Sequence, residues 1–144
     1  MTDSSTPDSL ATDSYDLELE GTVFETLGIE IVEAAADRVV LRMEVGPLVH
    51  QPFGLLHGGV SAVLVESAAS IGAHMNLDLA SQVSAGIELN ISHLRGRRDG
   101  HVIATGVPVR KGRTLQVWDV GIADENGDPV AVGRCTVAVR TRAS

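Results

Sequence analysis

Residues 58–77 form an apolar stretch that contains one carboxylate, Glu66. Apart from Glu66 and the titratable His74, every residue in this stretch is small, apolar or neutral polar. The pattern predicts a helix that begins near Gly58 and ends near Asn76, and a helix that is apolar all round is normally buried on all sides. A glutamate is rarely buried unless it is paired or needed for chemistry. Glu66 is therefore a candidate catalytic carboxylate.

Two structural alternatives compete with this interpretation of Glu66. The side chain could face a solvent-filled cleft, or it could form an ion pair with an arginine. Surface helices usually carry charged partners one turn apart, and this helix has none, which favours the catalytic interpretation. The stretch also approaches the length of about 20 residues that a membrane span needs. No membrane association is expected, because the stretch includes several polar residues: Glu66, His74, Asn76, three serines and three glycines.

The distribution of charge divides the chain into two parts. The chain has 144 residues, enough for one domain with a hydrophobic core, and its hydrophobic content of 44% is that of a globular protein. The net charge is −8, but all ten charged residues before Arg38 are acidic. From Arg38 onward there are eleven basic and nine acidic residues, a net charge of +2. This balance argues against nucleic-acid binding and leaves room for a local anion site.

Residues 1–19 are rich in Ser, Thr, Asp and Pro, and we expect a disordered acidic tail there, followed by one domain over residues 20–144. The tail has neither the basic nor the apolar region of a signal peptide, so a cytoplasmic location is expected. The single cysteine, Cys135, cannot form an intramolecular disulfide and is expected to be a small buried side chain, as Trp118 is expected to be a core or interface aromatic. The five histidines lack the spacing of metal ligands, so no metal is expected.

Alternating apolar residues predict six strands around the central helix. Two strands precede the helix, at about residues 29–33 and 38–45, and four follow it, at about 82–95, 101–110, 113–124 and 129–140. The connections are short, and the last contains Asn126-Gly127, a strong hairpin signal. Short connections require antiparallel neighbours, and an apolar helix requires a curved sheet around it. The expected fold is α+β, a six-stranded antiparallel sheet wrapped around one long helix, which is called a hotdog fold.

The start of the helix is suited to binding an oxygen that gains negative charge. Gly58 and Gly59 allow close approach to a ligand, and the free N–H groups and positive dipole end of a helix stabilise an oxyanion. Gln51 and His57 supply further donors nearby, although His57 could also be a loop histidine bonded to the backbone. Glu66 lies about 12 Å further along the same helix, too far to reach a carbonyl bound at Gly58. Two antiparallel helices related by a two-fold axis would bring them together, so a catalytic site requires at least a dimer.

Ser70 lies one turn after Glu66 on the same helix face. Its hydroxyl could position a water molecule, or it could be a small polar residue in a helix–helix contact. No serine in the helix has a base at a spacing that indicates a Ser-His-Asp triad.

Several segments of the chain, spread over roughly residues 22 to 140, resemble hotdog-fold acyl-CoA thioesterases of the glutamate-dependent, PaaI-like branch of the 4HBT superfamily. That branch includes one class of 4-hydroxybenzoyl-CoA thioesterase, the 1,4-dihydroxy-2-naphthoyl-CoA thioesterases and the enterobactin-pathway proofreading thioesterases. The resemblance rests on Gln-Pro-Phe-Gly-Leu-Leu-His-Gly-Gly at 51–59, Glu66 with Ser70, Asn-Ile-Ser-His-Leu-Arg at 90–95 and Gly-Arg-Thr-Leu-Gln-Val-Trp at 112–118. Serine at position 70 matches the naphthoyl type, since the 4-hydroxybenzoyl type has threonine there; the acidic tail has no counterpart in the family pattern.

The resemblance implies a role for each residue of the predicted site. Glu66 would act as nucleophile or general base, the Gly58 N–H would polarise the thioester carbonyl with help from Gln51 and His57, and Ser70 would help to place water. The substrate and its CoA phosphates would meet His93, Arg95, Arg113 and Thr114. The family works as a homodimer with shared sites, usually paired into a homotetramer, and needs no cofactor because CoA is part of the substrate.

Arginine suits phosphate, but the basic residues fall into two clusters at opposite ends of one predicted strand, roughly 30 Å apart. One contains Arg95, Arg97 and Arg98, the other Arg110, Lys111 and Arg113. The two clusters cannot bind one phosphate within a single chain, and either could simply be solvated turn charges.

The leading hypothesis is an acyl-CoA thioesterase acting on aromatic or bulky acyl groups. The alternatives are a non-catalytic acyl-CoA-binding or sensing domain, which leaves Glu66 unexplained, and a hydratase, which needs a different acid–base pairing.

Overall fold

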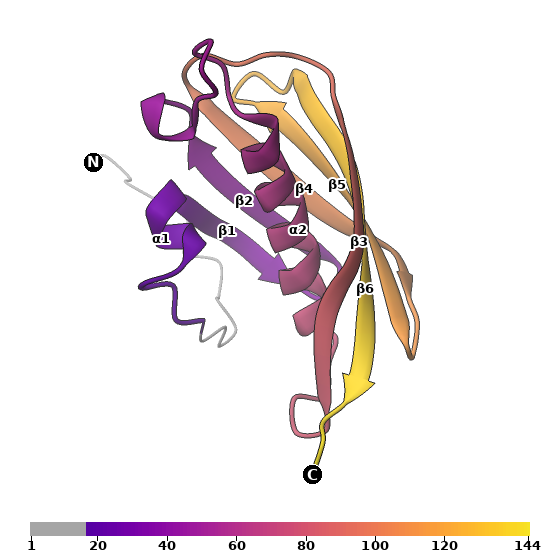
Figure 1. The fold of residues 1–144 in the computed structure, drawn as a ribbon. Helices are drawn as coiled ribbons and strands as arrows, with labels where there is room; N and C mark the ends of the chain where they lie inside the picture. The colour runs from indigo at the N-terminus through magenta and orange to yellow at the C-terminus, as the bar shows by residue number, and fades with distance from the viewer. Residues whose placement is uncertain (1–16) are drawn as a thin grey trace, which may run out of the picture.

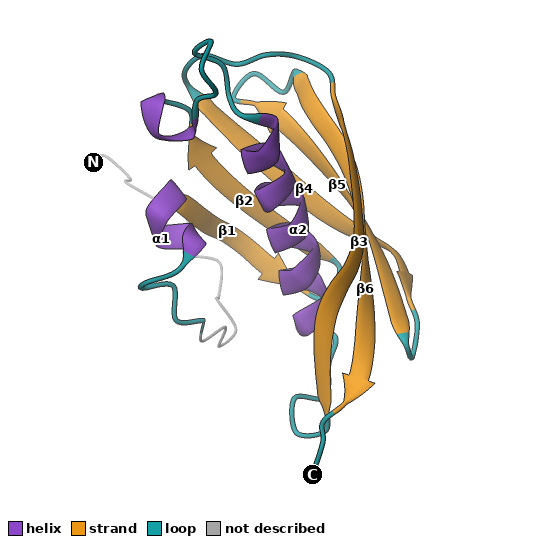
Figure 2. Cartoon of the chain, viewed as in Figure 1, coloured by secondary structure: helices purple, strands orange, loops and turns teal. Residues whose placement is uncertain are grey.

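The computed structural model describes residues 17–144, so the predicted tail lies outside the described residues except for its last three positions. These residues form two α-helices, one 3-10 turn and six strands, arranged as in Figures 1 and 2. In chain order these are α1 (Val23–Leu27), β1 (Ile29–Ala35), β2 (Arg38–Glu44), η1 (Pro47–Val49), α2 (Gly58–His74), β3 (Gln82–His93), β4 (His101–Lys111), β5 (Leu115–Asp124) and β6 (Pro129–Thr141).

The six strands form one antiparallel sheet in the order β1-β2-β4-β5-β6-β3. Helix α2 lies across one face of this sheet and contacts all six strands (Figure 1). The predicted α+β hotdog fold is confirmed. Within residues 17–144, β3 follows the helix in sequence but pairs only with the last strand, β6.

The core lies between α2 and the concave face of the sheet. Alternate residues of β2, Val39, Leu41 and Met43, are almost completely buried, as the period-2 pattern predicted. The helix contributes residues spaced three and four apart. These include Leu64, Val65, Ala68, Ala69 and Ile71.

Trp118 is fully buried, which confirms its expected place in the core. Its ring lies against Gly72 of α2, where a side chain would collide with it. The indole N–H donates to Gln116 Oε1 at 3.0 Å, and the Gln116 amide donates to the Ala73 carbonyl at 3.3 Å. These bonds satisfy the two buried polar side chains and tie β5 to the last turns of α2.

The structure differs from the sequence-based bounds at the ends of elements. The long helix ends at His74, because the Asn76 side chain donates to the Gly72 carbonyl at 2.8 Å and to the Ala36 carbonyl at 2.8 Å. Strand β5 begins at Leu115, since Arg113 and Thr114 belong to the turn closed by the Gly112 N–H and the Leu115 carbonyl.

One face of α2 is not covered in the single chain, contrary to the expectation of burial on all sides. Val63, Glu66, Ser67 and Ser70 are half-buried on this face. It lies beside β3, the edge strand, whose Val83 and Ile87 are exposed by 38% and 57%. An uncovered helix face next to an exposed strand edge is the kind of surface to which another protein chain can bind.

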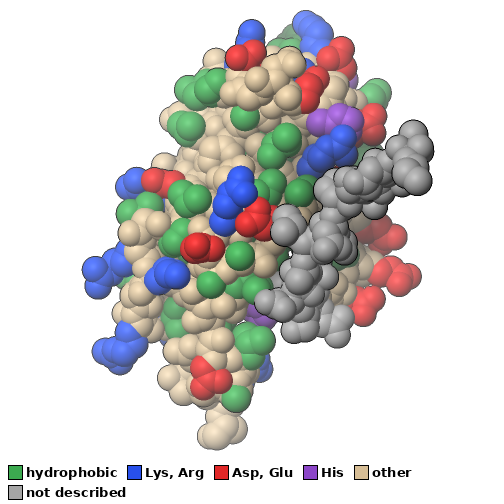
Figure 3. All heavy atoms as spheres, turned by 180° about the vertical axis from the view of Figure 1, so that it is seen from behind, with side chains coloured by type: hydrophobic (Ala, Val, Ile, Leu, Met, Phe, Trp, Pro, Cys, Tyr) green, Lys and Arg blue, Asp and Glu red, His purple; other side chains and the backbone are tan. Residues whose placement is uncertain are grey.

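The opposite, outer face of the sheet is seen in Figure 3, where apolar side chains are mixed with charged ones. A hollow of about 450 Å³ lies on this face near the β5–β6 turn. It is remote from the Glu66 face, because its lining comes from outward residues of β4, β5 and β6 such as Ile103, Thr105 and Val132. Within residues 17–144, no helix is both long enough and apolar enough to cross a membrane.

Candidate active site

Gln51 and His57 lie at the two ends of the loop that leads into α2. The loop is closed by the Gln51 N–H, which donates to the Leu55 carbonyl at 2.8 Å, and by the His57 N–H, which donates to the Val49 carbonyl at 2.9 Å. The Gln51 side-chain oxygen accepts the Phe53 N–H. The amide NH2 of Gln51 therefore remains available as a donor.

His57 caps the N-terminus of α2. Its Nδ1 accepts the Gly59 N–H at 2.8 Å, which is the backbone bond that the sequence left open as an alternative. Because Nδ1 accepts, a neutral ring carries its proton on Nε2, and His57 keeps one donor for a ligand. Within residues 17–144 no acceptor is found for the Gly58 N–H. The two donors proposed for an oxyanion are thus adjacent.

His93, at the end of β3, packs directly on Gly58. A Cβ added to Gly58 would lie 2.8 Å from His93 Nε2, so this close approach requires glycine. The structure therefore brings together four of the predicted site residues in one chain: Gln51, His57, Gly58 and His93.

The carboxylate of Glu66 lies against the sheet at the junction of β3 and β6. Its Oε1 occupies the space that a side chain at Gly86 would fill, and its Oε2 is 3.5 Å from Cys135 Sγ. The thiol donates to the carboxylate, a weak hydrogen bond. Gly86 and Cys135 therefore hold one orientation of Glu66.

Cys135 is buried, as expected from the sequence. Burial and the neighbouring Glu66 carboxylate raise the pKa of the thiol to about 12. The group is then protonated at neutral pH and is not a nucleophile. Its contact with Glu66 gives it a second function beside filling the core.

Glu66 and Gly58 are far apart within one chain. Glu66 contacts Gly86 near the middle of β3, whereas Gly58 contacts His93 at the end of the same strand. Gly86 and His93 are separated by roughly 23 Å at 3.3 Å per residue. The structure agrees with the estimate from the helix that one chain cannot present both groups to one carbonyl. Ser70 is half-buried one turn beyond Glu66, on the uncovered face.

The two basic clusters have different surroundings. Arg95 forms an exposed ion pair with Asp128 at 3.0 Å, and Arg97 pairs with Asp124 and Glu125 at 3.1 and 3.2 Å. This cluster is largely neutralised by the β5–β6 turn.

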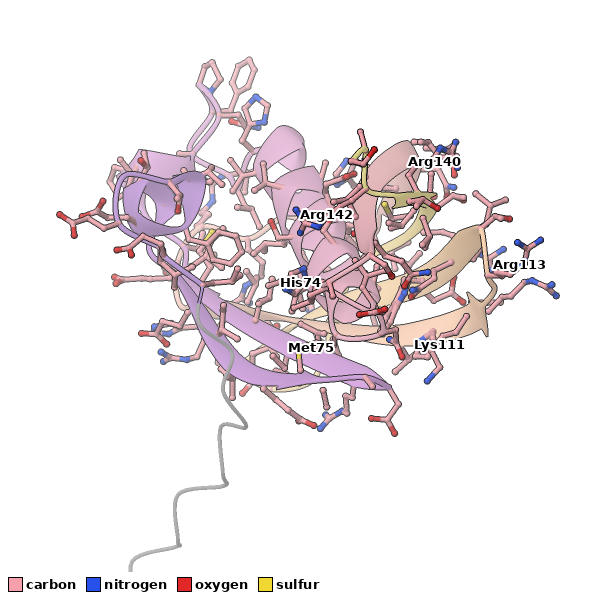
Figure 4. The ribbon with its side chains drawn as sticks, turned by 90° about the horizontal axis from the view of Figure 1, so that it is seen from below. His74, Met75, Lys111, Arg113, Arg140 and Arg142 are labelled. Carbon is pink, nitrogen blue, oxygen red and sulfur yellow. The ribbon has the colours of Figure 1, made fainter. Side chains whose placement is uncertain are left out.

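The second cluster lies at the other end of the molecule, where α2, β4 and β6 finish (Figure 4). Arg113 and Thr114 are exposed there, and the Thr114 carbonyl accepts the Val139 N–H at 2.9 Å, which fixes the turn next to the end of β6. Within residues 17–144, no carboxylate lies within ion-pair distance of the cations that share this end, Lys111, Arg113, Arg140 and Arg142.

Three residues that matter to the geometry were not singled out from the sequence as site residues. Gly86 and Cys135 contact Glu66, and Arg97 ties two loops together. The contacts of Gly86 and Cys135 depend on the pairing of β3 with β6, which sequence patterns do not reveal. Within residues 17–144, no group of three or more His, Cys, Asp or Glu side chains is placed to hold a metal ion.

The profile of the Thioesterase superfamily matches residues 53–131. A 1,4-dihydroxy-2-naphthoyl-CoA hydrolase from Listeria monocytogenes is 44% identical over 82% of this chain and 95% of its own length. The proofreading thioesterase EntH from Cronobacter turicensis is 38% identical over 83% of this chain and 86% of its own. A crystal structure of a mutant thioesterase from Pseudomonas aeruginosa superposes with a TM-score of 0.83 and 35% identity, covering 86% of this chain and 89% of that one.

The chain thus has a hotdog fold, with glycines at the start of α2 and the Glu66 carboxylate beside the edge strand β3. With the profile match and the identities above, the chain belongs to the thioesterase superfamily.

Proposed function

We propose that this chain hydrolyses acyl-CoA thioesters with Glu66 as the reacting carboxylate. The observation that carries the proposal is the placement of Glu66, a charged side chain fixed by Gly86 and Cys135 on the uncovered face of α2. A structural ion pair is disfavoured, because no basic group lies within ion-pair distance of Glu66 in the part of the chain that the structure describes.

The proposed chemistry uses two groups at each site. The Gly58 N–H, with His57 and Gln51, would bind the thioester oxygen and stabilise its negative charge as the carbonyl is attacked. Glu66 either attacks the carbonyl carbon itself, expelling CoA thiolate and leaving an anhydride for water to cleave, or removes a proton from the attacking water. Both routes give the free acid and CoA, and Ser70 would help to place the water.

The minimal active unit in this proposal is a homodimer formed through β3. In the part of the chain that the structure describes, that strand pairs only with β6, so its other edge presents unpaired backbone groups along its length. Antiparallel pairing with a second copy across a two-fold axis would satisfy them and cover the exposed face of α2.

The structure suggests where that two-fold axis would lie. Glu66 contacts Gly86, and Gly58 contacts His93 on the same strand. An axis crossing β3 between Leu89 and Asn90 would set Gly86 opposite the partner's His93. The carboxylate of Glu66 would then face the partner's Gly58. Pairing of two dimers into a homotetramer is proposed from the family resemblance alone.

Replacing Glu66 by glutamine tests the chemistry. Glu66→Gln keeps the shape of the side chain and should reduce turnover by about two to three orders of magnitude, as loss of a nucleophile or base does. The melting temperature should change little. Activity above about a tenth of wild type, in a protein of unchanged oligomeric state, would remove Glu66 from the reaction.

A subunit-mixing experiment tests the shared site. Glu66→Ala and Gln51→Ala proteins are each nearly inactive in this proposal, and after equal mixing and exchange half of the dimers are mixed. One of the two sites in a mixed dimer is intact, so about a quarter of wild-type activity should return. Demonstrated exchange without recovery would place each complete site within one chain.

We propose aromatic or otherwise bulky acyl groups as substrates, on the strength of relatives named as naphthoyl-CoA hydrolases. The small residues of α2 leave less space for an acyl group than the sequence indicated. Ala69 and Ala73 are fully buried in the core, and only Ala62 remains on the half-buried side of α2.

A panel of acetyl-, benzoyl- and naphthoyl-type CoA thioesters, with matching carrier-protein thioesters, measures the preference. A kcat/KM for acetyl-CoA equal to that for the aromatic esters would contradict it. Saturable binding of every ester without hydrolysis would instead indicate an acyl-CoA-binding domain.

A further inference from the structure

The loop that carries Gln51 and His57 is held from outside by the segment between β3 and β4, residues 94–100. The Leu56 N–H donates to the Arg97 carbonyl at 2.7 Å. The His50 ring nitrogen Nε2 is 2.7 Å from the Arg98 carbonyl, and the Arg98 guanidinium donates to the Phe53 carbonyl at 3.3 Å. These hydrogen bonds fix the loop that supplies the oxyanion donors.

The 94–100 segment is in turn anchored by the side chain of Arg97. The guanidinium donates to Asp124 Oδ2 at 3.1 Å and to both oxygens of Glu125 at 3.2 Å. Asp124 is 2% exposed, and its other oxygen accepts the Asn126 and Asp128 N–H groups at 2.9 and 3.0 Å. The carboxylate is therefore rigidly placed, and Arg97 itself is mostly buried, with a side-chain exposure of 18%.

We propose that Arg97 is a positioning residue for the reaction: its ion pairs with Asp124 and Glu125 hold the 94–100 segment against the loop that bears Gln51 and His57. The same residue makes both connections, since its side chain binds the β5–β6 turn while its backbone carbonyl binds Leu56. No substrate contact is assigned to Arg97. The inference depends on the proposed function only for its kinetic test.

The pair formed by Arg134 and Asp119 is a matched control. It links β5 and β6 with N···O distances of 2.6 and 3.2 Å, and both side chains are about half exposed on the outer face of the sheet, away from the 94–100 segment. Arg134→Met therefore removes a two-point arginine–carboxylate pair without touching the loop.

Amide hydrogen exchange tests the anchoring without reference to activity. In Arg97→Met, peptides covering residues 46–57 should exchange at least about tenfold faster than in wild type, while peptides from α2 and β5 stay protected. Arg134→Met should leave the 46–57 peptides unchanged. If Arg97→Met does not fold, Arg97→Lys is measured instead, because lysine keeps the positive charge but lacks the planar guanidinium that binds two carboxylates. Unchanged exchange at 46–57 in the folded variant would overturn the inference.

The kinetic test is a double-mutant cycle with Gln51→Ala. Arg97→Met should lower kcat/KM at least about tenfold in the wild-type background, because displacements near 1 Å have large effects on rate. In the Gln51→Ala background the further loss should be below about threefold, since Arg97 acts through the same loop. Equal losses in both backgrounds would show that Arg97 acts only on general stability. Absence of thioesterase activity in the wild type would refute the proposed function and leave the exchange result to decide on Arg97.

Discussion

Replacing Gly86 by alanine would put a methyl group into the space that the Glu66 carboxylate occupies. The added Cβ would overlap Glu66 Oε1, and it would lie 3.0 Å from Glu66 Cδ and 3.4 Å from Oε2. Carbon atoms in ordinary contact are 3.5–4.0 Å apart, so the carboxyl carbon must retreat by about 0.5–1 Å. The displaced carboxylate also moves away from Cys135.

A displacement of this size is expected to reduce kcat by roughly 30- to 100-fold with little change in KM, because positioning errors near 1 Å carry costs of that order. The effect on folding should be smaller. Alanine is favoured over glycine within a strand by about 0.5–1 kcal/mol, and overpacking opposes this by about 1–3 kcal/mol. The net effect is a destabilisation of at most about 2.5 kcal/mol, which the melting temperature reports separately from kcat.

The assay is steady-state hydrolysis of an aryl-CoA thioester, with the melting temperature followed by the fluorescence of the buried Trp118. Gly121→Ala on β5 is the control, because a Cβ there meets nothing within 4 Å. It should behave as wild type in kcat. A Gly86→Ala enzyme that keeps kcat within about threefold would show that Glu66 does not need the position seen against β3.

Three further predictions concern single side chains. The pKa of the Cys135 thiol is about 12 in the folded protein and 9.0 ordinarily, so the fraction of thiolate at neutral pH is roughly 1000-fold lower in the folded protein. Native Cys135 should therefore react with iodoacetamide about 1000-fold more slowly than Cys135 in urea, as measured by mass spectrometry. Comparable rates would contradict its burial beside Glu66. Arg113→Ala should raise KM for CoA esters with kcat unchanged, and more at low salt than at high salt, where charges are screened. Arg95→Ala should raise KM less than Arg113→Ala does, since Asp128 already pairs with Arg95. A larger increase in KM for Arg95→Ala would place the nucleotide beside Arg95. Burial acts to raise the pKa of Asp124, but the Asp128 and Asn126 N–H groups and Arg97 outweigh it and hold the pKa below 3.8. Wild type should therefore be more stable than Asp124→Asn by a constant unfolding free energy above about pH 5, and this difference should shrink as pH falls below 4. Urea titrations that give a difference independent of pH would refute this.

The sequence predicted the fold well, because the signals were local. The alternation in β2 and the apolar stretch of α2 both correspond to buried faces, and the Asn126-Gly127 turn forms with Gly127 at φ 86°. The bounds shifted only where a side chain or a turn bond intervened, as at Asn76 and Leu115.

The sequence indicated candidate residues for the site but not the contacts between them. Gln51, His57 and Gly58 lie near one another because a short loop closed by backbone hydrogen bonds joins Gln51 to His57, and Glu66 was chosen as a candidate because a carboxylate is unusual in an apolar helix. The contact of His93 with Gly58, and those of Gly86 and Cys135 with Glu66, join parts of the chain that are distant in sequence. Such contacts follow from strand order, which hydrophobic periodicity leaves undetermined.

The pairing of β3 with β6 also sets the order in which the molecule can be completed during synthesis. Among the described strands β3 pairs with β6 alone, and Gln82 at its start pairs with Thr141, which is synthesised much later. A ribosome-bound chain that has emerged only as far as β5 can pair β1, β2, β4 and β5, while residues 82–93 still lack the strand with which they pair. The position of Glu66 against Gly86 and Cys135 is consequently among the last features to form. A chain without β6 would also leave β3 unpaired, and it would lose the surface that orients this carboxylate.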